Sequence, residues 1–334
     1  MSRFIRYTII LFVLVLWLGG LSSTISHWLY ETGVIVDDYR YGDLYRLSNL
    51  PQFKDKQPEC PPSNRSSDTA RTHLYIIGDS FSEPQRVNKQ DFRVSHFQRV
   101  QWDHLQAAQL NPNKRNVLLI ESVERHFREH FARPVAELVV QQDTTQAAKP
   151  KLSWRRRIGD DIHLSDIEER LESALFSHDL FFWFKELKAS LTYRLFDRSS
   201  PAVSLSTDHE HVLLNMDTDT TKRLNSSFST LTDLEVATLV DSVNSVAERY
   251  KRLGFDEVYI SIIPNKTTIL DPNRGEYNHL IERIQQHPAL RVSVIDTYRV
   301  YKQTQQRVYL VGDSHWNCTG RALWLNQVRQ KLGI

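Results

Sequence analysis

Strand-like and helix-like patterns alternate along much of this chain. Short, nearly continuous apolar runs predict strands at 74–78, 117–121, 135–140, 257–263, 292–296 and 308–312. Apolar residues at helical spacing predict helices at 233–253, 276–286 and 319–332. Continuous apolar strands are typical of a parallel sheet that is buried on both faces. The alternation therefore predicts an α/β fold, a three-layer αβα sandwich of the flavodoxin-like kind with a mostly parallel sheet.

The chain begins with a different pattern. Arg3 and Arg6 precede an almost wholly apolar run at 7–21, and aromatic and aliphatic residues extend it to position 30. Such a segment predicts a single-pass transmembrane helix at 1–30 that contacts the lipid bilayer. Because the basic residues come first, the bulk of the chain is expected outside the cytoplasm, in the periplasm or at the cell surface. Cleavage as a signal peptide near Ser22 is the alternative.

The rest of the chain divides by composition. Residues 31–70 predict a linker that ends in a stretch rich in proline and small polar residues, and 71–334 predict one catalytic domain. The alternation lapses near 141–230, which predicts an insertion with a helix near 162–196. That helix carries the aromatic run 180–184, which we expect to pack in a core. If the run is exposed instead, it predicts a sugar platform or a membrane contact.

Charge and cysteine content add two constraints. The formal net charge of +2 gives no reason to expect a nucleic-acid partner, because such proteins concentrate basic residues on one face. The tight basic run 155–157 is expected to be a solvated surface. Cys60 and Cys318 are the only cysteines. In an oxidising compartment they could pair, but their spacing does not decide between a disulfide and two free thiols.

Two short motifs far apart in the sequence supply the residues of a serine esterase. Ser80 follows the strand-like run at 74–78, and Asp313 and His315 follow the one at 308–312. Carboxyl ends of parallel strands meet along one edge of a sheet, where ligands bind. Ser80 is predicted as the nucleophile, His315 as its base and Asp313 as the group that orients the imidazole. The neighbouring Ser314 is a less favoured nucleophile.

These motifs carry a resemblance to a known family. Gly78-Asp79-Ser80-Phe81 is similar to the nucleophile block of SGNH hydrolases, and the segment 313–317 with Gly320 resembles the Asp-x-His block of their alginate O-acetyltransferase branch. The segment 263–266 is similar to a Pro-x-Lys segment of that branch. The resemblance implies an SGNH fold over about 70–334 and O-acetyl transfer to a polysaccharide. The chain has no Gly-x-Asn-Asp block, so no second oxyanion donor is identified.

Five further residues are expected to line the same crevice and bind substrate: Glu121, Arg125, Asn265, Lys266 and Trp316. Arg125 could hold a sugar carboxylate in a bidentate pair, and an ion pair with a glutamate on the same helix is the equal alternative. Lys266 either lines the site or faces water. No cofactor and no metal are expected.

The sequence therefore predicts transfer or hydrolysis of acyl esters, most of all O-acetyl groups, on a cell-envelope or exported polysaccharide. A membrane-bound protein that supplies the acyl group is a candidate partner. The first alternative is a catalytically silent polysaccharide-binding subunit with the same fold. The second is a zinc peptidase, because His126, Glu129 and His130 fit a His-x-x-Glu-His pattern, although the third ligand that such a site needs is not apparent.

Overall fold

The computed structural model describes residues 2–22, 38–56, 58–102, 104–140 and 179–334, together with Ile25, Trp28 and Thr32. The chain forms two units. The first comprises 1–56 and 145–199, and the second comprises 57–144 and 200–334. The basic run 155–157 and the first part of the helix expected near 162–196 lie outside the described residues.

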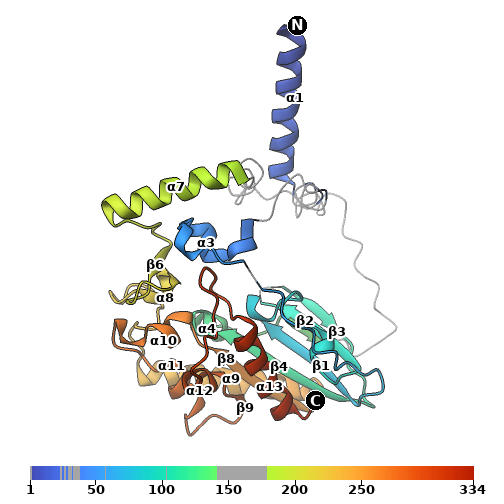
Figure 1. Ribbon diagram of the computed structural model, residues 1–334. Helices are drawn as coiled ribbons and strands as arrows, with labels where there is room; N and C mark the ends of the chain where they lie inside the picture. The colour runs from blue at the N-terminus through green and yellow to red at the C-terminus, as the bar shows by residue number, and fades with distance from the viewer. Residues whose placement is uncertain are drawn as a thin grey trace. The chain divides into compact units, whose positions relative to one another are not determined.

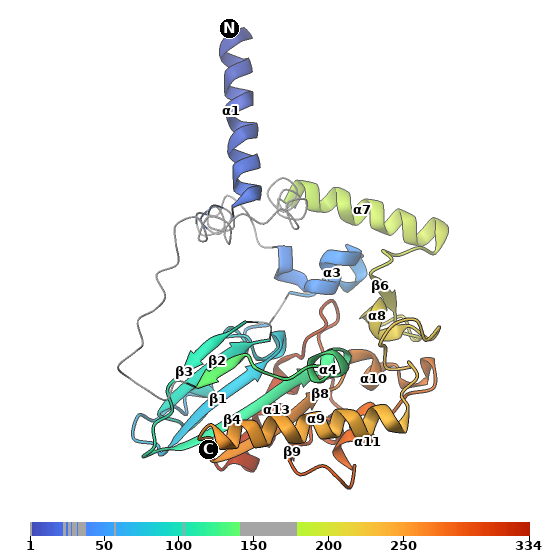
Figure 2. The same ribbon diagram turned by 180° about the vertical axis from the view of Figure 1, so that it is seen from behind.

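The second unit is built on a parallel five-stranded sheet with the order β2-β1-β4-β8-β9. Figure 1 shows this sheet and Figure 2 shows it from behind. Its strands are β1 (Thr72–Gly78), β2 (His96–Gln101), β4 (Arg115–Val123), β8 (Glu257–Ile263) and β9 (Ser293–Ile295). Two small sheets accompany it: a parallel pair, β3 (Gln106–Ala108) with β5 (Leu138–Val140), and an antiparallel pair, β6 (Val203–Leu205) with β7 (Val212–Leu214).

Helices cover both faces of the central sheet, which confirms the α/β fold with a parallel sheet and is compatible with a three-layer sandwich. Successive side chains of a strand point to opposite faces. Tyr75 and Ile77 accordingly pack in a core with α9 (Asp233–Arg252) and α11 (Leu280–Gln285), whereas Leu74 and Ile76 pack in a core with α12 (Thr297–Gln303) and α13 (Cys318–Leu332). The remaining helices of this unit are α4 (Glu124–Phe131), α8 (Asn215–Thr218) and α10 (Lys266–Leu270).

The prediction of a strand at 308–312 is wrong. This segment does not join the central sheet, and its only ladder contact is an isolated antiparallel bridge between Tyr309 and Trp316. The backbone N–H of Leu310 donates to the carbonyl of His315, and that of Asn317 donates to the carbonyl of Val308. The apolar run is therefore one side of a buried loop, 308–317, which we call the histidine loop.

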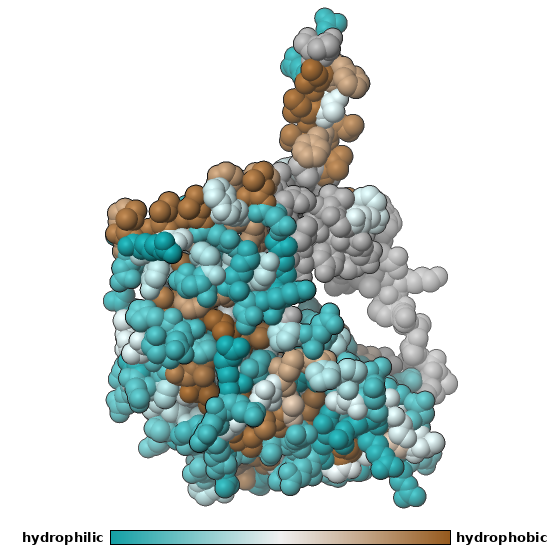
Figure 3. All heavy atoms as spheres, in the orientation of Figure 1, coloured by the Kyte–Doolittle hydropathy of each residue, from teal (hydrophilic) through white to brown (hydrophobic). Residues whose placement is uncertain are grey.

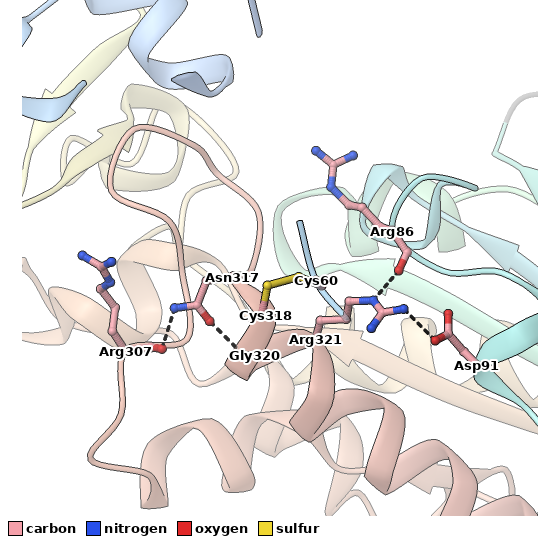
Figure 4. Close-up of a disulfide and its surroundings, with 8 residues drawn as sticks. All are labelled: Cys60, Arg86, Asp91, Arg307, Asn317, Cys318, Gly320 and Arg321. Carbon is pink, nitrogen blue, oxygen red and sulfur yellow. Dashed lines mark hydrogen bonds and ion pairs between the residues drawn. A yellow bond between two sulfur atoms is a disulfide. The ribbon is translucent and has the colours of Figure 1, made fainter. Parts of the chain in front are cut away.

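The two cysteines form a disulfide. Cys60 and Cys318 lie 258 positions apart in sequence, with their Cα atoms 5.2 Å apart. Cys318 begins α13 directly after the histidine loop, so the bridge ties the segment before β1 to that loop. Figure 4 shows the same helix end, where Asn317 accepts a hydrogen bond from the N–H of Gly320 and donates to the carbonyl of Arg307. Of the two interpretations that the sequence left open, the structure shows the disulfide.

The first unit contains α1 (Ser2–Leu21), α3 (Asp43–Ser48) and α7 (Asp179–Phe196), with short 3-10 turns at Asp38–Tyr41 and Pro51–Phe53. A search of the described helices for one both long and apolar enough to cross a bilayer found none. The aromatic run 180–184 on α7 was expected to pack in a core, and this prediction is wrong for four of its five residues. Phe182 is buried, but Leu180, Phe181, Trp183 and Phe184 are exposed.

Removal of the disulfide should destabilise the protein. Cys60→Ser should lower the free energy of unfolding by about 2–5 kcal/mol, because the bridge closes a very long loop and so restricts the unfolded chain. Chemical denaturation of the non-reduced protein measures the change. The double variant with Cys318→Ser should lose no more than either single variant, and a clearly additive loss would contradict the bridge.

Candidate active site

Ser80, His315 and Asp313 form one continuous chain of hydrogen bonds. The Ser80 Oγ lies 2.7 Å from Nε2 of His315, and Nδ1 of the same ring lies 2.5 Å from Oδ1 of Asp313. The carboxylate accepts a hydrogen bond from Nδ1–H of the imidazole, which leaves Nε2 free to accept the serine proton. The hydrogen bond predicted between Ser80 and His315 is therefore present.

The electrostatics of Asp313 keep it ionised. Burial of this carboxyl would by itself raise its pKa, but the His315 ring and two hydrogen bonds from His315 hold the pKa of Asp313 below its usual range. A carboxylate that stays charged fixes the imidazole in one tautomer and stabilises the imidazolium when a proton arrives. Asp313 and His315 are both buried, whereas Ser80 is half-buried.

Ser80 is placed by the end of β1 and by the short 3-10 turn Ser80–Ser82. Two largely buried carboxyl groups, those of Asp79 and Glu121, hold this turn in place through hydrogen bonds. Asp79 accepts the backbone N–H of Val123 at the end of β4, and Glu121 accepts the backbone N–H of Asp79. Gly78 is favoured because a Cβ there would lie 2.1 Å from Oγ of Ser82 and 2.6 Å from Oε2 of Glu121. The glycine of the motif thus admits the glutamate behind the nucleophile.

Burial shifts the pKa values of both of these carboxyl groups in the same direction. The pKa of Glu121 and the pKa of Asp79 are raised, in each case mainly because burial disfavours the charged form. The nearby charge of Asp79 further raises the pKa of Glu121, since like charges close together disfavour ionisation. Glu121 therefore serves as a buried support for the turn.

His315 is positioned by the histidine loop, and a buried lysine holds this loop. The Nζ of Lys266 donates to the carbonyls of Val212, Val311 and Asp313 at 2.7, 2.8 and 3.1 Å. Lys266 begins α10 and is only 2 % exposed. It therefore joins β7 and the two sides of the histidine loop from within, and neither of the roles expected from the sequence, at the substrate or in water, describes it.

The other residues expected to bind substrate also lie inside the protein. Asn265 accepts the backbone N–H of Arg125 and donates to Ser227, so it links α4 to a neighbouring loop. The Arg125 guanidinium is 7 % exposed and lies 3.6 Å from Asp217. Trp316 packs edge-to-face on Phe81, with ring centroids 5.0 Å apart. Glu121, Arg125, Asn265 and Lys266 are thus positioning residues in this structure, whereas Trp316 also lines a pocket.

The pattern that suggested a zinc peptidase is occupied by other contacts. Nδ1 of His130 lies 2.8 Å from the Ser122 hydroxyl, and its ring stacks on Trp102 with centroids 3.9 Å apart. Nε2 of His130 lies 3.8 Å from Asp79. Within the described residues, His126 and His130 belong to no group of three potential metal ligands. His130 instead supports the turn that carries Ser80.

Two arginines that the sequence did not indicate hold the nucleophile turn. Arg99 of β2 donates to the carbonyls of Gly78 and Asp79, and Arg86 donates to the carbonyl of Ser80 and to Glu83. β2 is an edge strand with several polar residues, so it gave no continuous apolar signal. Arg86 lies in a turn with no motif of its own. Neither position could be recognised without the fold.

A pocket of about 390 Å³ is lined by Arg86, Leu310 and Trp316 among others, but not by Ser80, Asp313 or His315 themselves. Three of its lining residues contact them or their neighbours: Arg86 bonds the Ser80 carbonyl, Leu310 bonds the His315 carbonyl, and Trp316 follows His315. The disulfide and Arg321 close another part of the pocket. Figure 4 shows Arg321 bonded to the carbonyl of Arg86 and to Asp91.

Comparisons with known proteins add no family to this geometry. No protein-family model, no curated protein and no solved structure matches the chain. The fold and the hydrogen-bonded Ser80, His315 and Asp313 define an α/β protein with a serine, histidine and aspartate arranged as in acyl-transferring enzymes. The likeness to SGNH hydrolases stays a prediction from the sequence.

Glu124 predicts a measurable dependence of stability on pH. Burial raises the pKa of Glu124 to about 7 from an ordinary value of 4.5, against hydrogen bonds from Thr268 and from the backbone of Asn265. The native state therefore keeps a proton that the unfolded chain loses. This contribution is fully present below about pH 4.5 and is lost as the pH rises to about 7, by up to about 3 kcal/mol.

In the variant Glu124→Gln this component should disappear, so that its free energy of unfolding changes less than that of the parent between about pH 4.5 and about pH 7. Chemical denaturation over that range measures it. Glu129→Gln on the same helix is the matched control, because the Glu129 side chain is 72 % exposed. Equal slopes for the parent and Glu124→Gln would contradict the assignment.

Lys266 predicts a local effect on the histidine loop. Lys266→Met should leave three buried carbonyls without their donor and lower the free energy of unfolding by about 3 kcal/mol or more. Amide hydrogen exchange over 308–317 should become faster. The exposed Lys302 provides the control variant Lys302→Met, which should leave both measurements unchanged. Unchanged exchange in Lys266→Met would show that the loop does not depend on this lysine.

Proposed function

We propose that this protein transfers or hydrolyses acyl esters, most of all O-acetyl groups, on a cell-envelope or exported polysaccharide. The observation that carries the proposal is the hydrogen-bonded series from Ser80 through His315 to Asp313. A serine hydroxyl is a weak nucleophile until a base of this kind removes its proton. The half-buried serine is also the one member of the series that a substrate can approach from solvent.

The reaction begins with attack of the Ser80 Oγ on the ester carbonyl. His315 Nε2 takes the serine proton as the new bond forms, and it then gives that proton to the departing alkoxide, so that an acyl-serine and a free alcohol result. Asp313 remains ionised throughout. In the second half, His315 deprotonates water or a sugar hydroxyl, which attacks the acyl group and restores Ser80. Water gives an esterase and a sugar hydroxyl gives a transferase.

The proposal extends to where the protein acts. The disulfide between Cys60 and Cys318 fits an oxidising compartment outside the cytoplasm. The arginines before the apolar segment of α1 favour the same side for the rest of the chain. We include in the proposal attachment to the cell membrane, an SGNH-like fold and a membrane-bound protein that supplies the acyl group. The pocket lined by Arg86, Leu310 and Trp316 is the proposed place for the acceptor sugar.

Loss of the nucleophile should abolish the activity. Ser80→Ala and His315→Ala should each lower the rate of acetyl release from p-nitrophenyl acetate by about three powers of ten or more, and the double variant should lose little beyond that. Ser314→Ala is the control, because it removes the neighbouring serine and leaves Asp313 and His315 in place; it should keep most of the rate. Parent-level activity in Ser80→Ala would overturn the proposal and favour a catalytically silent polysaccharide-binding subunit.

A further inference from the structure

Helix α7 carries a continuous row of exposed apolar side chains. We call this row the α7 apolar face. Its members are three or four positions apart, so they lie on one side of the helix. They are Leu180, Phe184, Leu187, Leu191 and Leu195, whose side chains are 65, 54, 41, 48 and 69 % exposed. Figure 3 shows the hydrophobic side chains that gather along α7. An exposed apolar surface of this kind marks an interaction site.

The opposite side of α7 is the side that packs within its own unit. Phe182 is 2 % exposed and stacks on Tyr45 of α3, with ring centroids 5.9 Å apart. Glu186 accepts a hydrogen bond from Tyr45 and pairs with Lys54. The helix is therefore held by one face. The α7 apolar face takes no part in these contacts, so packing within this unit does not explain why its residues are apolar.

The charges around the α7 apolar face have one sign. Lys188 and Arg194 are exposed, and each lies three positions from Leu191, on either side of the row. The two acidic residues of the helix are occupied elsewhere, since Asp179 pairs with Arg40 and Glu186 pairs with Lys54. Trp183 is also exposed, beside the row. An apolar row with basic and aromatic flanks is the composition of helices that lie in the surface of an anionic membrane.

A second helix of the same unit points to lipid instead of a protein partner. Among the described side chains of α1, the large hydrophobic ones, such as Phe4, Leu11 and Trp17, are exposed, and they are distributed around the helix instead of along one side. A helix that is apolar all round requires apolar surroundings. A protein partner would need one matching groove for α7 and another enclosing site for α1, whereas one bilayer provides both environments.

We propose that α7 lies in the surface of an anionic lipid bilayer, with the α7 apolar face in the boundary between headgroups and acyl chains and with Lys188 and Arg194 among the headgroup phosphates. Long basic side chains can reach these phosphates while their stems stay against apolar surface. This contact is additional to the membrane attachment that the proposed function assigns to α1. It does not depend on which reaction Ser80 performs.

The test uses introduced cysteines in the full chain. Both native cysteines are in the disulfide, and the described chain has no free one, so Leu187→Cys and Leu191→Cys each create a single labelling site for an environment-sensitive NBD probe. Leu234→Cys on α9 of the other unit is the matched control, since Leu234 is an exposed leucine of a helix, 79 % exposed. Each labelled protein is reconstituted in vesicles of phosphatidylcholine and phosphatidylglycerol, with and without doxyl-labelled lipid.

The labels at 187 and 191 should emit at shorter wavelength in vesicles and lose intensity when doxyl lipid is present, whereas the label at 234 should do neither. Replacement of Lys188 and Arg194 by glutamine should weaken the quenching in these anionic vesicles. Quenching at 187 and 191 no greater than at 234 would overturn the proposal. A shorter emission wavelength without quenching would also overturn it, because the face would then be covered by protein. Far-UV circular dichroism equal to that of the parent establishes that each variant is folded.

Discussion

The site of Ser80, His315 and Asp313 depends on a restraint that keeps the histidine loop in place, because this loop is not part of the central sheet. His315 lies on the histidine loop, yet its ring must stay within hydrogen-bonding distance of Ser80 at the end of β1. Lys266 provides that restraint, because its ammonium donates to carbonyls of β7 and of both ends of the loop turn. An ammonium removed from water is costly unless its donors are satisfied. Three carbonyl partners satisfy it, so the cation and the loop stabilise one another.

The disulfide restrains the same loop from the other end. Cys318 immediately follows the loop, and Gly320 allows α13 to begin there, since a Cβ at that position would lie 2.3 Å from the carbonyl of Val308. On the opposite side of the site, Asp79 and Glu121 hold the Ser80 turn through backbone N–H groups of β4 and of the turn. The serine and the histidine are thus each fixed by buried polar contacts, and they meet without support from a shared strand pair.

Much of this arrangement could be predicted from the sequence, and the failures have physical causes. β1, β4 and β8 are central strands with continuous apolar runs, so their pattern is unambiguous. β2 lies at the edge and is half polar, so its pattern gave no strand. The run at 308–312 was mistaken for a strand because Val308, Tyr309 and Leu310 are buried as strand residues would be, and burial alone does not distinguish a core loop from a strand. The contact of Ser80 with His315 was predicted correctly from the motif chemistry, although the strand at 308–312 that was expected to deliver His315 to the sheet edge does not form.

The residues expected to contact substrate were predicted from their position at strand ends, and the same position explains their burial. At the carboxyl edge of this sheet, loops and short helices cover the ends of β4 and β8, so Glu121 and Asn265 meet backbone groups instead of solvent. Arg86, by contrast, lies in a turn at the surface, where it lines the pocket and also bonds the Ser80 carbonyl. A change at this position therefore acts on the pocket and on the nucleophile turn together, so the shape of the pocket is coupled to the geometry of Ser80.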